Sequence, residues 1–76
     1  MPDETDDAIL KAMAPGGSAY RTLPALQRLT GLPADELAQR LARLERQGYL
    51  SGHVYRGARE YCLSPSGQTY ADALDG

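Results

Sequence analysis

The sequence has no phenylalanine or tryptophan, and only one cysteine and one histidine among its 76 residues. A single cysteine excludes an internal disulfide and a zinc site built from cysteines alone. No apolar run approaches the roughly 20 residues that a transmembrane helix needs. The first ten residues, MPDETDDAIL, are acidic where a signal peptide is basic. We therefore expect a cytoplasmic protein without a membrane segment, forming a single domain over residues 1–76, with a core built mainly from leucine and alanine.

The charge is distributed unevenly, although the formal net charge is only −2. Residues 3–7 carry four carboxylates, which predicts an acidic N-terminal tail over residues 1–7 that is free to be flexible. Residues 8–71 contain all eight cations and four carboxylates, which leaves a net charge of +4 there. Seven of the eight cations are arginine, the side chain suited to bidentate contact with phosphate or guanine.

Apolar spacing predicts three helices, at about residues 5–13, 24–29 and 33–47, with room for a brief extended segment over 18–22. We expect Thr5 to cap the first helix, and Leu23, Leu26 and Leu29 to form the buried face of the second. Gly31 is expected to end the second helix.

The third helix has the clearest pattern. Leu37, Leu41 and Leu44 recur at i, i+4 and i+7, and Gly48 follows as a terminator. The opposite face is polar and rich in arginine: it carries Gln39, Arg40, Arg43, Arg46 and Gln47. The sequence therefore predicts one buried face and one cationic face.

A β-hairpin is predicted from Tyr49 to about Ser64. With Gly57 and Ala58 as a two-residue turn, the expected register pairs Val54 with Tyr61 and His53 with Cys62. Strand alternation then places four apolar residues on one face: Leu50, Val54, Tyr61 and Leu63. Ser64-Pro65 follows as an N-cap and first helical residue, which predicts a last helix to about Leu74.

Two blocks of this pattern carry a resemblance to a known family. LTGLPADELAQRLARLERQGYL (29–50) looks like a helix end, turn and recognition helix, and REYCLSPSG (59–67) looks like an outgoing wing strand and the start of the next helix. In this order they resemble the winged helix-turn-helix family, as in MarR-like and PadR-like bacterial transcription regulators. The resemblance covers almost the whole chain. It implies a mainly α fold with a small β-hairpin: a three-helix core, a two-stranded wing and a C-terminal helix.

The resemblance also implies double-stranded DNA as the partner and transcription regulation as the function. The helix at about 33–47 would read the major groove, whose width admits an α-helix, and the wing at 53–62 would contact flanking DNA. A homodimer is one possible assembly. The candidate DNA-binding residues are Gln39, Arg40, Arg43, Arg56, Arg59, Arg28 and Arg21.

Other interpretations of the same residues remain open. The arginines could form internal ion pairs, such as Glu36 with Arg40, or Arg59 with Glu45 or Glu60. Residues 1–7 could fold over the basic face and inhibit binding. The alternative function is a winged-helix module that contacts a protein partner without binding DNA directly, a hypothesis based on the acidic N-terminus and the carboxylates that begin the third helix.

No catalytic constellation is found in the sequence, which contains no glycine-rich phosphate loop and no base beside a nucleophile. His53 and Cys62 are too few for a structural zinc site, which takes four ligands. We expect a protein that is not an enzyme and that uses no cofactor or metal.

Overall fold

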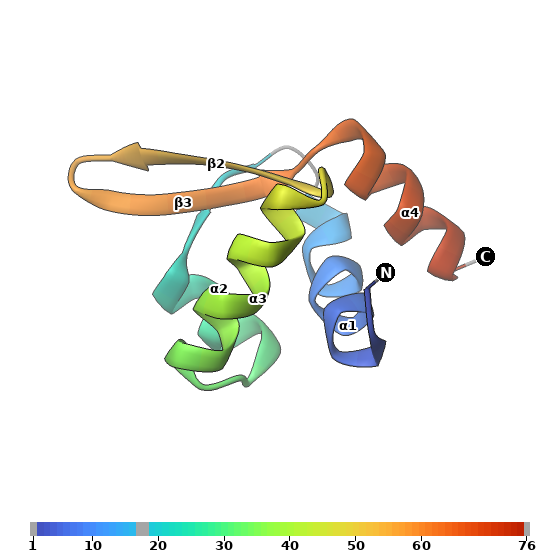
Figure 1. The fold of residues 1–76 in the computed structure, drawn as a ribbon, viewed down its shortest axis with the longest axis horizontal. Coiled ribbons are helices and arrows are strands. Elements are labelled where there is room, and N and C mark those ends of the chain that lie inside the picture. The colour runs from blue at the N-terminus through green and yellow to red at the C-terminus, as the bar shows by residue number, and fades with distance from the viewer. Residues whose placement is uncertain (1, 17–18, 76) are drawn as a thin grey trace.

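The order of helices and strands follows the sequence prediction. The structure, a computed structural model, describes residues 2–16 and 19–75. Gly17 and Ser18, the second of which begins the predicted extended segment, lie outside the described residues. The elements in chain order are α1 (Glu4–Met13), the short 3₁₀ helix η1 (Ala14–Gly16), β1 (Arg21–Thr22), α2 (Leu23–Thr30), α3 (Ala34–Arg46), β2 (Leu50–Tyr55), β3 (Ala58–Leu63) and α4 (Pro65–Asp75) (Figure 1).

The core is aliphatic and lies where the helices meet the base of the sheet. Leu37, Leu41 and Leu44 are fully buried, which confirms the predicted inner face of α3. They are joined by Ile9, Leu10, Met13, Leu26, Leu50, Tyr61, Leu63 and Ala71. Each fully buried leucine contributes about 1.5 to 3 kcal/mol of transfer free energy.

The predicted burial of Leu29 is wrong, since this residue is 42% exposed. Each three-residue step turns a helix by about 300°, so Leu29 lies about 60° around the helix from the fully buried Leu26. Leu32, beyond the end of α2, packs against the core.

α1 begins at Glu4, one residue before the predicted helix start, so the acidic residues from Glu4 onward are helical and do not form a flexible tail. Asp3 is the N-cap, not Thr5: its carboxylate accepts a hydrogen bond from Asp6 N at 2.9 Å, and Asp3 N donates to the Asp6 carboxylate at 3.3 Å. Thr5 instead lies within the first turn. This reciprocal pair satisfies two backbone donors that a helix start leaves unpaired.

The hairpin register differs from the predicted one. β2 pairs with β3 so that His53 lies opposite Glu60 and Val54 lies opposite Arg59. The two turn residues are Arg56 (φ 51°) and Gly57 (φ 79°), not Gly57 and Ala58. A turn with two positive φ values takes glycine readily at its second position, and this shifts the turn by one residue. Because the pairing shifts by an even number of positions, the predicted inward face is kept, although Val54 near the tip is 62% exposed.

A short third strand completes the sheet, in the order β1-β3-β2. Figure 1 shows β2 and β3 projecting from the helices at one end of the molecule, with α4 at the other end. Tyr70 of α4 donates its hydroxyl hydrogen to Asp7 of α1 at 2.7 Å. None of the helices within residues 2–16 and 19–75 is long and apolar enough to cross a membrane. The outer face of α3 and the projecting hairpin are thus left uncovered by α4.

Candidate nucleic-acid interface

The outer face of α3 presents polar side chains to solvent. Gln39 and Arg46 are exposed, and both lie on the side of the helix opposite Leu37 and Leu44. Among the described residues, neither side chain has a hydrogen-bond or ion-pair partner. Ala42 is also exposed on this side and is short. The amide of Gln39 and the guanidinium of Arg46 are therefore both available to a ligand on the solvent-facing side of α3.

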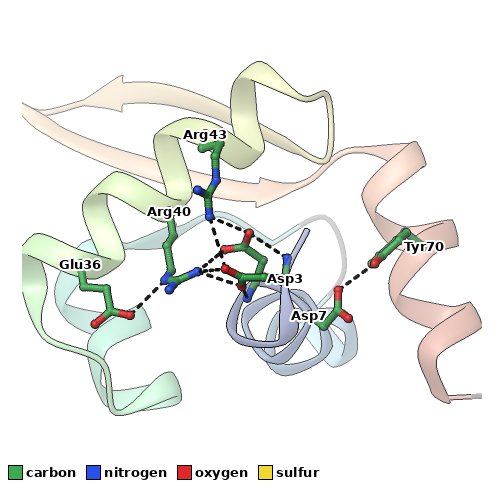
Figure 2. Close-up of polar contacts among 7 residues, drawn as sticks. Asp3, Asp7, Glu36, Arg40, Arg43 and Tyr70 are labelled. Atoms are coloured by element: carbon green, nitrogen blue, oxygen red, sulfur yellow. Dashed lines mark hydrogen bonds and ion pairs between the residues drawn. The ribbon is translucent and has the colours of Figure 1, made fainter. Parts of the chain in front are cut away.

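Arg40 is held by carboxylates on three sides. Its Nε donates to Glu36 Oε2 at 3.0 Å, and its Nη1 donates to Asp3 Oδ2 at 2.9 Å and to Asp6 Oδ1 at 3.0 Å (Figure 2). These hydrogen bonds, that to Asp3 first, raise the pKa of the guanidinium. The side chain is only 21% exposed, while Asp6 is fully buried. The alternative expectation of a Glu36–Arg40 pair is confirmed, and Arg40 joins α3 to the start of α1.

Arg43 forms a hydrogen bond with one aspartate and a longer ion pair with another. Its Nη2 donates to Asp6 Oδ2 at 2.9 Å, while the nearest Asp3 oxygen lies 3.8 Å away. The side chain is 44% exposed. Figure 2 shows Arg40 and Arg43 extending from α3 toward Asp3 at the start of α1. Arg43 thus anchors to α1 while part of its guanidinium remains open to solvent.

The wing carries one exposed arginine at its tip and one on its inward-facing side. Arg56 occupies the turn, where its guanidinium lies 5.3 Å from the centre of the Tyr55 ring. Arg59 donates to Tyr61 Oη at 3.1 Å and to Glu45 Oε1 at 3.1 Å. The hydrogen bond with Tyr61 contributes most to the raised pKa of Arg59.

The pairing of Arg59 with Glu45, one of the open alternatives, is therefore confirmed. A methyl group on Gly52 would lie 2.9 Å from the Glu45 carboxylate, so the glycine leaves the space in which this carboxylate sits. The Arg59 side chain is still 53% exposed.

The two remaining predicted arginines differ in exposure. Arg28, in the last turn of α2, is exposed and has no carboxylate partner in the described part of the chain. Arg21, in β1, is half-buried, and its guanidinium lies against Gly16.

The predicted pairing of His53 with Cys62 is wrong. His53 Nε2 lies 2.9 Å from Glu60 Oε1, and its ring packs against Tyr20 with the ring centres 4.0 Å apart. Cys62 lies opposite Ser51 and is buried. The Cys62 thiol is the main cause of the raised pKa of the Tyr20 hydroxyl. The one-residue shift of the turn makes His53 and Cys62 diagonal neighbours on one face of the hairpin, where the predicted register had them directly opposite.

Arg46 belongs to the polar face that the sequence predicts, although it is not one of the seven candidate DNA-binding residues. Its signal was the same helical periodicity that selected Gln39, because seven residues complete about two turns. The roles of Asp3 and Asp6 as partners of α3 had a weaker signal. The sequence indicated them only through the hypothesis that residues 1–7 fold over the basic face and inhibit binding. The ion pairs of Asp3 with Arg40 and of Asp6 with Arg43 confirm the contact with this face, while the inhibition stays a prediction.

Comparison with solved structures identifies the architecture. The chain superimposes on BpsR of Bordetella bronchiseptica, whose DNA binding is regulated by 6-hydroxynicotinic acid, with a TM-score of 0.85 and 17% identity over 95% of this chain. It matches MepR, a transcription regulator of the Staphylococcus aureus multidrug efflux pump MepA, with a TM-score of 0.83 and 15% identity over 95% of this chain. The fold is a winged helix-turn-helix.

The share of each neighbour that is matched differs. The chain spans 52% of BpsR and 54% of MepR, so it corresponds to about half of each. A protein of Ralstonia eutropha JMP134 is matched over 98% of its length, and over 97% of this chain, with a TM-score of 0.83 and 22% identity. No protein-family model matches the sequence, and comparison with curated protein sequences yields no match. Similarity at these identities establishes the fold, while the function has to be argued from the site.

Proposed function

We propose that this protein binds double-stranded DNA and acts as a transcription regulator. The observation that carries the proposal is the exposed pair formed by Arg46 on the outer face of α3 and Arg56 at the wing tip, neither of which has a carboxylate partner among the described residues. Two cationic groups on separate projecting elements can contact a DNA backbone at separate points. The fold supports this, because BpsR and MepR are a DNA-binding protein and a transcription regulator.

In this proposal α3 enters the major groove. Its 13 residues span about 20 Å, and an α-helix about 10 to 12 Å wide fits a groove about 12 Å wide. Gln39 is the side chain placed to read a base edge, since an amide can bond to adenine in two places. Arg43 and Arg46 flank it as contacts to phosphate or guanine.

The wing and α2 supply the backbone contacts. Arg56 and Arg59 reach the minor groove or its phosphates, with Arg59 exchanging Glu45 for a phosphate oxygen. Arg28 and Arg21 are assigned to backbone contacts beside α2, where Arg28 is the more accessible. Arg40 contributes mainly by fixing α3 against α1. The proposed role is binding rather than catalysis, and a homodimer would place two half-sites about 10 base pairs apart.

The test is a titration of a labelled mixed-sequence duplex followed by fluorescence anisotropy at about 50 and 200 mM salt. Because phosphate contacts release counterions, binding is expected at the lower salt and a steep loss of affinity at the higher salt. Absence of binding at about 50 mM salt would refute the proposal. It would instead favour the alternative function of binding a protein partner, which the structural neighbours do not favour.

A further inference from the structure

A small polar depression lies where α1 meets α3. Its volume is about 150 Å³, and it is lined by Asp3, Glu36, Gln39, Arg40 and Arg43. Gln39 and Arg43 belong to the proposed DNA-reading face, so the depression opens on that face. The donors around it are one amide and two guanidiniums, the groups that bind phosphate oxygens.

Two aspartates contact these guanidiniums, and they differ sharply in exposure. The Asp6 side chain is fully buried, while the Asp3 side chain is 53% exposed at the rim. Asp6 is therefore a fixed partner. Asp3 can rotate into solvent without unfolding α1, at the cost of its N-cap hydrogen bond to Asp6 N. The Arg40 guanidinium lowers the pKa of Asp3 from its usual 3.8, so this carboxylate is ionised at neutral pH.

The charges at this junction nearly cancel. Asp3, Asp6 and Glu36 oppose the two guanidiniums of Arg40 and Arg43, which gives a local formal charge of −1. Without Asp3 the local charge is zero, and one set of guanidinium hydrogens is freed. A carboxylate and a phosphate group compete for the same donors, because the oxygens of both accept hydrogen bonds from the planar guanidinium fork.

We propose that Asp3 is an internal competitor for DNA: its carboxylate occupies the position at which a backbone phosphate binds Arg40 and Arg43. This inference rests on the proposed function and adds a phosphate-binding site that the Asp3 carboxylate fills in the free protein. The exchange replaces one oxygen anion by another on the same donors, so the N-terminal residues reduce affinity without closing the reading face.

The test compares Asp3→Asn with Glu4→Gln in the 76-residue protein. Asparagine caps a helix as well as aspartate does, so Asp3→Asn removes the charge and keeps the cap. Glu4 is an exposed residue in the first turn of α1 with no carboxylate–arginine contact to α3, and its substitution changes the net charge equally. Deletion of residues 1–7 is a poorer test, because it also removes the buried Asp6.

Asp3→Asn is expected to bind the mixed-sequence duplex about two- to five-fold more tightly at about 50 mM salt, the range that exposed ion pairs support. The gain is expected to shrink at about 200 mM salt, where such pairs are screened. Glu4→Gln is expected to leave the affinity close to that of the unsubstituted protein. Melting temperatures of both variants separate a binding effect from a change in stability.

Each outcome decides a different claim. Equal gains in both variants would mean that net charge alone acts, and binding by the unsubstituted protein with no gain in Asp3→Asn would refute only the competitor. If none of the three proteins binds the duplex, the proposed function fails and this inference fails with it.

Discussion

Arg46 offers the sharpest test of which arginines contact DNA. It lies in the last turn of α3, is exposed, and has no partner among residues 2–16 and 19–75. In the proposed complex, replacing it by alanine removes one phosphate contact and keeps the helix, since alanine has the highest helix propensity. Each phosphate contact contributes about 0.9 to the slope of log K against log salt concentration. A fourfold rise in salt therefore costs about 3.5-fold in affinity for each contact.

The assay measures this slope for Arg46→Ala and for Lys11→Ala. Lys11 carries the same charge but lies on α1 beside Leu74 of α4, away from α3. Arg46→Ala is expected to lower the magnitude of the slope by about 0.9, and Lys11→Ala to leave it unchanged. An unchanged slope in Arg46→Ala, or the same decrease in both variants, would refute the assignment of Arg46 to the interface.

Three further predictions concern stability and the wing. Gly67→Ala is expected to destabilise the fold by about 1 to 3 kcal/mol in urea unfolding, because the added methyl overlaps the Tyr49 carbonyl oxygen. The hydrogen bond to Asp7 raises the pKa of Tyr70 from 10.0 to about 12, so its stabilising effect is full below pH 10 and is lost as the pH rises toward 12. Tyr70→Phe should remove this part of the pH dependence of unfolding, and an unchanged profile would argue against the contact. Arg56→Asn is expected to stabilise the hairpin by about 1 kcal/mol, because Arg56 has a φ of 51° that asparagine tolerates better. The same substitution is expected to weaken duplex binding. Unchanged stability would show that the turn is unstrained.

The parts of the fold that depend on local chemistry were predictable from the sequence. Gly31 (φ 75°) directly follows α2, and Gly48 (φ 90°) lies two residues after the end of α3. Both have the left-handed conformation that glycine favours after a helix. The inner face of α3 followed from the spacing of Leu37, Leu41 and Leu44, which are all fully buried. Each of these features is decided by neighbours within a few residues.

The sequence predictions fail where two local conformations are nearly equivalent, or where a contact joins residues that are distant in the sequence. The hairpin turn could use Gly57 at its first or second position, and the two choices keep the same inward face, so apolar alternation could not distinguish them. The partners of Arg40 were also hidden, because Asp3 lies 37 residues away in the sequence. Helical periodicity identifies a polar face, but it does not reveal which of its charges meet carboxylates from another helix.

A guanidinium that joins two helices is less available to a phosphate, so counting arginines overstates the positive charge that the proposed DNA-reading face offers to phosphates. The side-chain exposures of the arginines held by carboxylates rise from 21% for Arg40 to 44% for Arg43 and 53% for Arg59. If only Arg28, Arg46 and Arg56 reach phosphates, the salt slope should be about −2.7. If one phosphate also displaces Asp3 from Arg40 and Arg43, and another displaces Glu45 from Arg59, the slope should be about −4.5. The half-buried Arg21 is left out of both counts. The measured slope thus reports how many internal ion pairs are exchanged on binding. A value near −2.7 would leave those pairs as structural contacts between α1, α3 and the wing.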